Sequence, residues 1–208
     1  KYVQSDLDGV FREIREALKT RPVLFSGTPC QVDGLYRFLG CRPENLTTCD
    51  LVCHGVPSPA VFRAWLDRLE ADRGAKVTAV RFKDKSHGWS HPWLTVELDD
   101  GSRYTQDFNR TTYGRGFGMQ LFLRPACARC QYTSTSRPAD FTLADYWGLD
   151  PKLSLPVERD KGVSMVLVNS ARGQRVFDAL SPRFGQVERP VEEAVAGNPR
   201  LKSPLKAN

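Results

Sequence analysis

Two short apolar segments of this chain both end at a cysteine in a turn that contains Gly and Pro. Residues 22–25 lead into Ser26-Gly27-Thr28-Pro29-Cys30, and residues 46–52 lead into Cys53-His54-Gly55-Val56-Pro57. An amphipathic stretch follows each turn, which predicts a helix after each strand. Strands that alternate with helices are typical of an α/β fold, and ligands of open α/β sheets bind at the carboxyl edge of the sheet. We therefore expect both cysteines to lie at that edge.

The rest of the sequence completes a mixed α/β pattern. Period-two alternation between residues 77 and 108, with a turn at Asp99-Asp100-Gly101, predicts an antiparallel hairpin region beside the main sheet. A chain of 208 residues can form one large domain, so we predict a single domain, residues 1–208, with a mixed sheet flanked by helices. The other expected elements are a helix from Ser5 or Asp6 to about Lys19, helices over 31–39, 58–72, 113–123 and 171–180, a strand over 163–168, a turn at 191–196 and a poorly ordered tail at 199–208.

A single CxxC pair, Cys127-Ala128-Arg129-Cys130, joins Cys30 and Cys53 as a candidate metal-binding set. Thiolates from a tight CxxC and two distant loops can close a tetrahedral site around a metal ion or an iron-sulfur cluster. A structural zinc site usually has two such pairs, so a cluster fits this pattern better. The alternative is a module for binding or assembly, without catalytic activity, that is stapled by one zinc ion on the same four cysteines.

The composition argues against several classes of protein. Six cysteines are too few for a disulfide scaffold and suit a reducing, cytoplasmic compartment, with Cys41 and Cys49 interpreted as packing thiols. No apolar run approaches the roughly 20 residues that cross a bilayer, and the N-terminus has no secretion signal. The net charge of +6 is spread along the chain, so we expect no nucleic acid as a partner. The same charge suits an anionic cofactor or an acidic electron-transfer partner.

Two places in the sequence can meet the phosphates of a cofactor. Ser26, Gly27 and Thr28 join a strand to a helix N-terminus, where backbone N–H groups and the helix dipole favour an anion. Lys83 and Lys85 lie in a charged loop with Trp89, whose ring can cover an aromatic cofactor. An ordinary turn and a solvated loop are the alternatives at these two places. No residue is assigned a catalytic role.

Long motifs, in order over residues 1 to about 170, resemble the beta subunit family of coenzyme F420 hydrogenases and dehydrogenases. They are Lys1-Tyr2-Val3-Gln4-Ser5, Phe25-Ser26-Gly27-Thr28-Pro29-Cys30-Gln31, Asp50-Leu51-Val52-Cys53-His54-Gly55-Val56-Pro57-Ser58-Pro59, Phe82-Lys83-Asp84-Lys85 with Gly88-Trp89, Leu123-Arg124-Pro125, Arg137-Pro138-Ala139-Asp140-Phe141-Thr142 and Lys161-Gly162-Val163-Ser164. One departure is Ala144, where the family pattern has Gly before Asp145, and its methyl group is expected to crowd a close approach of the backbone to the cofactor.

The resemblance implies an iron-sulfur flavoprotein oxidoreductase. It implies a bound FAD, a 4Fe-4S cluster held by Cys30, Cys53, Cys127 and Cys130, and electron transfer between the cluster and a small hydride acceptor such as coenzyme F420. Implied partners are a ferredoxin or the other subunits of a hydrogenase or dehydrogenase. Family members often carry a ferredoxin-like segment upstream, so we expect this chain to be a fragment that lacks it.

Overall fold

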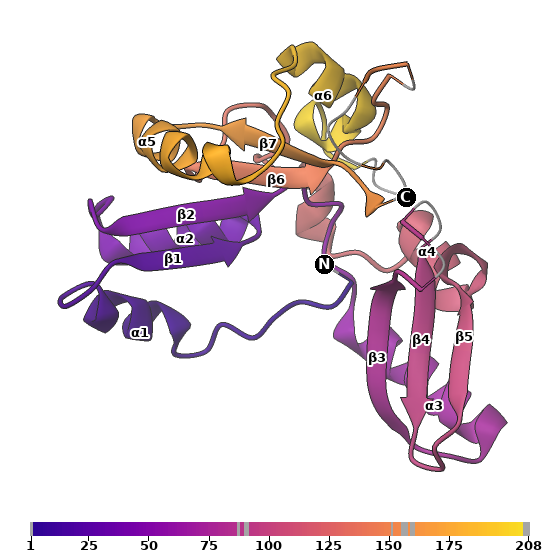
Figure 1. The fold of residues 1–208 in the computed structure, drawn as a ribbon. Coiled ribbons are helices and arrows are strands. Elements are labelled where there is room, and N and C mark those ends of the chain that lie inside the picture. The colour runs from indigo at the N-terminus through magenta and orange to yellow at the C-terminus, as the bar shows by residue number, and fades with distance from the viewer. Residues whose placement is uncertain are drawn as a thin grey trace.

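The structure, a computed structural model, describes residues 2–86, 88–89, 92–150, 152–154, 158 and 161–205. Within these residues the fold is mixed α/β, as predicted, with a four-stranded sheet and a three-stranded sheet. Figure 1 shows the two sheets as separate lobes, with both ends of the chain lying where the lobes meet. His87 of the predicted cofactor loop and residues 206–208 of the predicted tail lie outside the described residues.

The four-stranded sheet has the order β1-β2-β6-β7. Its strands are β1 (Val23–Gly27), β2 (Leu46–Leu51), β6 (Phe141–Asp145) and β7 (Ser164–Val168). The first three run parallel and β7 is antiparallel, so the predicted mixed sheet is confirmed. The carboxyl ends of β1 and β2 therefore meet at one edge, because Gly27 pairs with Asp50.

Helices α1 (Val10–Ala17) and α2 (Pro29–Leu39) pack against β1 and β2. Val32 and Leu35 of α2 are fully buried there, together with Leu46 of β2. The helix α2 ends at Gly40, which has a φ of 71°, a conformation that glycine adopts without strain. This core holds the edge that carries Cys30 in a rigid position.

The three-stranded sheet is the predicted hairpin region, with β3 (Val77–Asp84), β4 (Trp93–Leu98) and β5 (Arg103–Asp107) all antiparallel. Helix α3 (Pro59–Arg73) begins after Ser58, as the sequence predicts, and packs on this sheet with the short helix α4 (Thr112–Gly118). The core between them is aromatic; Phe108, Tyr113 and Phe117 are its buried rings.

Two helices lie toward the C-terminus. Helix α5 (Ala171–Leu180) has the predicted bounds, and helix α6 (Val191–Gly197) occupies the region where only a turn was predicted. Residues of α6 form a third core with β6 and β7, in which Tyr146, Met165 and Ala194 are buried. No helix in the described part of the chain is long and apolar enough to span a membrane.

Besides α6, three predicted elements differ from the structure, and one strand was not predicted. The first helix begins at Val10 and not near Ser5, because Gly9 adopts a φ of 77° and interrupts the helical path before it. The helix predicted over 113–123 ends at Gly118, within a run of glycines that favours no long helix. The strand β6 was not predicted as a strand. Residues 199–205 of the predicted tail form 3-10 helix η5 at Pro199–Leu201 and pack on the domain, where Leu201 and Leu205 are buried.

Candidate functional site

Backbone pairing brings the Cys53 turn to the CxxC segment. Pro57 and Leu123 form an isolated antiparallel bridge, and the N–H of Arg124 donates to the carbonyl of Val56 at 2.9 Å. The 3-10 helix η2 (Pro125–Arg129), which carries Cys127, starts immediately after this pairing. Residues more than seventy positions apart in sequence are thereby held side by side.

The four predicted ligand cysteines share one neighbourhood. Burial raises the pKa of the Cys53 thiol, a backbone hydrogen bond from Gly55 partly opposes this, and the nearby thiols of Cys127, Cys30 and Cys130 raise the pKa further. The three other thiols therefore lie within electrostatic range of Cys53. The structure thus brings together segments that begin after β1, after β2 and at η2.

Two of these sulfurs make hydrogen bonds, one with a backbone N–H donor and one with a hydroxyl that can donate or accept. The backbone N–H of Val56 donates to Cys127 Sγ at 3.4 Å, and the hydroxyl of Thr28 lies 3.1 Å from Cys30 Sγ. Hydrogen bonds to thiolate sulfur are one of the means by which proteins tune iron-sulfur clusters. Within the described residues, no group of three or more His, Cys, Asp or Glu side chains is arranged to hold a single metal ion.

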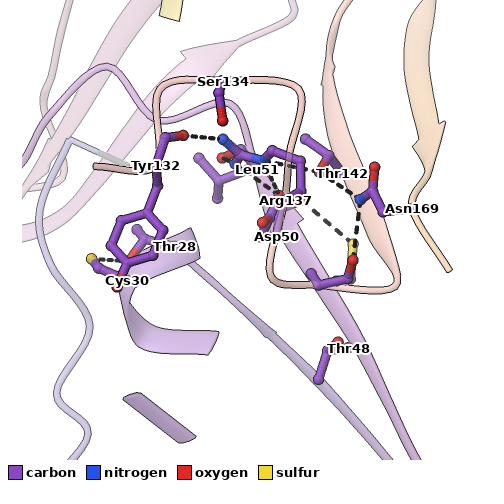
Figure 2. A network of polar contacts seen from close by, with 12 residues as sticks. Thr28, Cys30, Thr48, Asp50, Leu51, Tyr132, Ser134, Arg137, Thr142 and Asn169 are labelled. Carbon is purple, nitrogen blue, oxygen red and sulfur yellow. Dashed lines mark hydrogen bonds and ion pairs between the residues drawn. The ribbon is translucent and has the colours of Figure 1, made fainter. Parts of the chain in front are cut away.

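A buried arginine connects the segments that carry the cysteines. Arg137 pairs with Asp50 at the end of β2, at 2.9 Å, and also donates to the carbonyl of Leu51, two residues before Cys53. The same guanidinium donates to the carbonyl of Tyr132, two residues after Cys130, at 2.5 Å. Figure 2 shows Arg137 at the centre of these contacts.

Tyr132 extends the network to the third segment. Its hydroxyl donates to Asp33 Oδ2 at 2.7 Å, one turn after Cys30 in α2, and Figure 2 shows its ring beside Thr28 and Cys30. Hydrogen bonds from Arg37 and from Tyr132 lower the pKa of Asp33, so this carboxylate is ionised and accepts both. All three cysteine-bearing segments are therefore tied to Arg137, directly or through Tyr132.

The C-terminal segment, residues 198–205, covers the cysteine site from another side. Gly55 has a φ of 141°, and a Cβ placed there would lie 2.8 Å from Leu123, 3.2 Å from Leu205 and 3.6 Å from Cys127. Leu205 therefore packs directly over the Cys53 turn. Burial lowers the pKa of Arg200 in the same segment, while the nearby Cys130 raises it.

A second cluster lies where the two sheets meet. Lys83, at the end of β3, has a φ of 54°, which is strained for a residue with a side chain, and it sits at an irregularity in the pairing with β4. Its ammonium reaches Asp145 Oδ2 at the end of β6, at 2.5 Å. Trp89 donates from Nε1 to the other oxygen of Asp145, at 3.3 Å, and stacks on Trp147 with ring centroids 4.7 Å apart.

The predicted phosphate-binding residues fall in two different surroundings. Lys83 and Lys85 line an open pocket of about 640 Å³ along β3. Arg81 and Asp84 also line it, so its formal charge is positive, although Arg81 pairs with Glu97 and Lys83 with Asp145. Ser26 and Gly27 end β1, while the N–H of Thr28 is already bonded to Gln31 Oε1 at 2.8 Å. Thr28 thus faces Cys30, whereas Lys83 and Lys85 lie on the other lobe. Their role with phosphates stays a prediction.

Comparison with known families identifies the family of the chain. A family profile that describes the C terminus of the coenzyme F420 hydrogenase/dehydrogenase beta subunit matches residues 20–191. The chain belongs to this family. The predicted resemblance is thereby confirmed, and the beta subunit family is one of oxidoreductase subunits. No curated protein matches this member of the family.

The remaining predicted residues have ordinary surroundings or differ from expectation. His54 of this beta-subunit domain lies 3.4 Å from the carbonyl of Phe117 and packs on its ring. Cys49 is partly buried in β2, but Cys41 is exposed and does not pack as predicted. Ala144 packs against the third core, and its expected crowding of the cofactor stays a prediction.

Sequence analysis assigned no role to Arg137, Asp50 or Arg200. Arg137 and Asp50 are part of the family motifs, which was the only signal in the sequence that marks them. Arg200 lies beyond the residues that match the family, in a segment predicted to be poorly ordered, so its sequence carried no signal.

Proposed function

We propose that this beta-subunit domain holds a 4Fe-4S cluster on Cys30, Cys53, Cys127 and Cys130, binds FAD beside it, and passes electrons between a redox partner and a small hydride acceptor. The meeting of the segments that carry the four cysteines supports this proposal most strongly. These segments are distant in sequence, and the Pro57–Leu123 bridge and the contacts of Arg137 and Tyr132 hold them together at the edge where α/β folds bind ligands. The backbone N–H that donates to Cys127 is of the kind that iron-sulfur sites use, and the Thr28 hydroxyl beside Cys30 can donate in the same way to a thiolate.

The chemistry that the two cofactors supply, when bound, is hydride exchange at the flavin and single-electron transfer at the cluster. The protein itself binds the two cofactors, orients them and excludes water from them. Cys30 and Thr28 start helix α2 on the core of the first lobe, and Arg137 holds the Cys53 and Cys130 segments at a fixed spacing. Such a rigid frame would limit how far the surrounding protein reorganises when the cluster gains or loses an electron.

FAD contacts are proposed from Lys83 and Lys85, which line the positively charged pocket on β3, and from Ser26, Gly27 and Thr28 at the end of β1. The stacked indoles of Trp89 and Trp147 lie next to Lys83 and offer a flat apolar surface to an aromatic ring. Coenzyme F420 is the acceptor in the family's name, and it is the first candidate substrate. A ferredoxin, or the other subunits of a hydrogenase or dehydrogenase, would be the electron partner in the cytoplasm.

Anaerobic purification followed by iron, sulfide and flavin analysis tests the cofactor content. We expect brown protein with equal amounts of iron and sulfide, about four of each per chain, as a 4Fe-4S cluster requires. Cys127→Ser should lose most of the iron, whereas Cys41→Ser, at an exposed thiol away from the site, should keep it. A colourless protein that holds one zinc ion on the same cysteines would show that the chain is a structural module instead.

Coenzyme F420 is tested separately, by mixing its reduced form with the flavin-loaded protein under anaerobic conditions. Bleaching of the flavin absorbance is expected if the deazaflavin is the hydride donor or acceptor. If the flavin stays oxidised while a reduced ferredoxin still reduces it, the small-molecule substrate is a different hydride carrier.

A further inference from the structure

The C-terminal segment, residues 198–205, is packed against the cysteine site although its sequence predicts no order. Asn198 is buried and donates to the carbonyls of Ala194 and Asp145, at 3.2 and 3.4 Å. Leu201 is 2% exposed in the third core, and Leu205 is 6% exposed over Gly55. The segment is thus anchored at both ends, with Arg200 held between the anchors.

Arg200 is partly buried, and one end of its guanidinium is closed off from water. Its Nη1 is shielded from solvent and makes no hydrogen bond within the described part of the chain. A guanidinium is always charged at neutral pH, and a buried polar group without a partner is costly. Leu205 of the same segment lies at the cysteine site, because a Cβ placed at Gly55 would be 3.2 Å from Leu205 and 3.6 Å from Cys127. Burial lowers the pKa of Arg200, and the Cys130 thiol partly opposes this.

We propose that Arg200 is a fixed counter-charge to the iron-sulfur cluster and raises the reduction potential of that cluster. This inference rests on the proposed function, because it requires a cluster on Cys130. Four thiolates outweigh the positive charge of the iron-sulfur core, so the cluster is anionic and gains a further negative charge when it is reduced. A nearby guanidinium stabilises the reduced form more than the oxidised form, and its free N–H can bond a sulfur atom.

Replacement of Arg200 tests the charge. Arg200→Gln keeps polar N–H groups but removes the charge. In this variant the equilibrium constant for one-electron reduction of the cluster should fall about tenfold. This fall corresponds to a reduction potential that is lower by about 59 mV. Arg200→Lys keeps the charge and should stay closer to the natural protein. Lys202→Gln removes the same charge from an exposed position two residues away and should leave the potential unchanged.

The measurement is a redox titration of the reconstituted protein followed by electron paramagnetic resonance, with iron content determined for each variant. If the natural protein takes up no iron and sulfide, the proposed function itself fails. If it takes up a cluster and Arg200→Gln has the same potential at equal iron content, only the role of Arg200 is overturned.

Thermal unfolding gives a readout that does not depend on loading the variant. Without a cluster, the charge of Arg200 lacks its counter-charge, so Arg200→Gln should leave the Tm of the cluster-free protein unchanged or raise it. With the cluster, the same change should lower the Tm. If Arg200→Gln loses the cluster during reconstitution, and the cluster-free variant then has the same Tm as the cluster-free natural protein, the result supports the proposal. An equal fall in Tm with and without the cluster would show a purely structural contact and overturn it.

Discussion

Arg137 and Asp50 form an ion pair in which the two side chains are 1% and 0% exposed. They are 87 positions apart in the sequence, and the pair joins the end of β2 to the segment that follows the CxxC pair. A buried ion pair adds little net stability against an apolar pair, but it holds its partners in one geometry. Its place here is the junction of the three segments that carry the proposed cluster ligands.

Arg137→Met should therefore destabilise the protein strongly. Loss of the guanidinium leaves the carboxylate of Asp50 buried without its partner, which costs about 3–5 kcal/mol of unfolding free energy. Urea denaturation of the cluster-free protein measures this. Arg68→Met is the matched control, because Arg68 pairs with Asp72 on the exposed face of α3 and such pairs contribute about 0.5 kcal/mol. Similar losses for the two variants would contradict the structural role of Arg137.

Gly55→Ala should disturb the cysteine site. The φ of 141° is strained for a residue with a Cβ, and the new methyl group would lie 2.8 Å from Leu123. We expect a loss of about 1–3 kcal/mol of unfolding free energy, together with lower iron content after reconstitution.

Gly34→Ala is the control for this substitution. Gly34 lies inside α2, and a Cβ there would be 3.7 Å from the ring of Phe11, which is an ordinary contact. Alanine is favoured over glycine in a helix by about 0.5–1 kcal/mol, so this variant should be as stable as the natural protein or more so. Equal behaviour of the two alanine variants would show that the Cys53 turn tolerates a side chain.

Two substitutions of Lys83 separate the effect of its backbone conformation from the effect of its charge. Lys83→Gly and Lys83→Ala both remove the ammonium that contacts Asp145, but only glycine adopts a φ of 54° without strain. The glycine variant should be more stable than the alanine variant by about 1 kcal/mol. If Lys83 meets the flavin phosphates, both variants should bind FAD more weakly by the same factor, as measured by flavin fluorescence. Equal stabilities would mean that the backbone strain is relieved in solution.

The hydrogen bonds of Asp84 predict that the stability of the protein falls at low pH. A hydrogen bond from the Thr95 hydroxyl, followed by the N–H and hydroxyl of Ser86, lowers the pKa of Asp84 to about 2. A lowered pKa means that the folded state prefers the carboxylate, so the stabilisation is present above the ordinary value of about 4 and is lost as the pH falls toward 2. Thr95→Val, which removes the largest of these bonds, should reduce the fall in Tm over this range. A Tm profile identical to that of the natural protein would rule out Asp84 as a contributor.

Local elements of the fold were largely predictable from sequence. The bounds of α2, α3 and α5 follow from amphipathic spacing and from Gly40, Ser58 and Ser170 at their ends, which act over a few residues. The strand β6 was missed because it is short and has Asp at its end, and only its neighbours in the sheet stabilise it. Strand β6 lies between β2 and β7, and this place depends on how the whole chain folds and not on the five residues of the strand.

The sequence by itself determined that two strands end in cysteines, that one CxxC follows a hairpin region, and that the motifs belong to the beta subunit family. Only the tertiary structure decided which polar groups serve that site. Arg137 finds Asp50 across most of the chain, Lys83 meets Asp145 between the two lobes, and Arg200 comes to Cys130 on a segment that looked poorly ordered. Spacing and capping depend on neighbours a few residues away, whereas these charged contacts depend on how distant segments pack, and no short-range pattern encodes that.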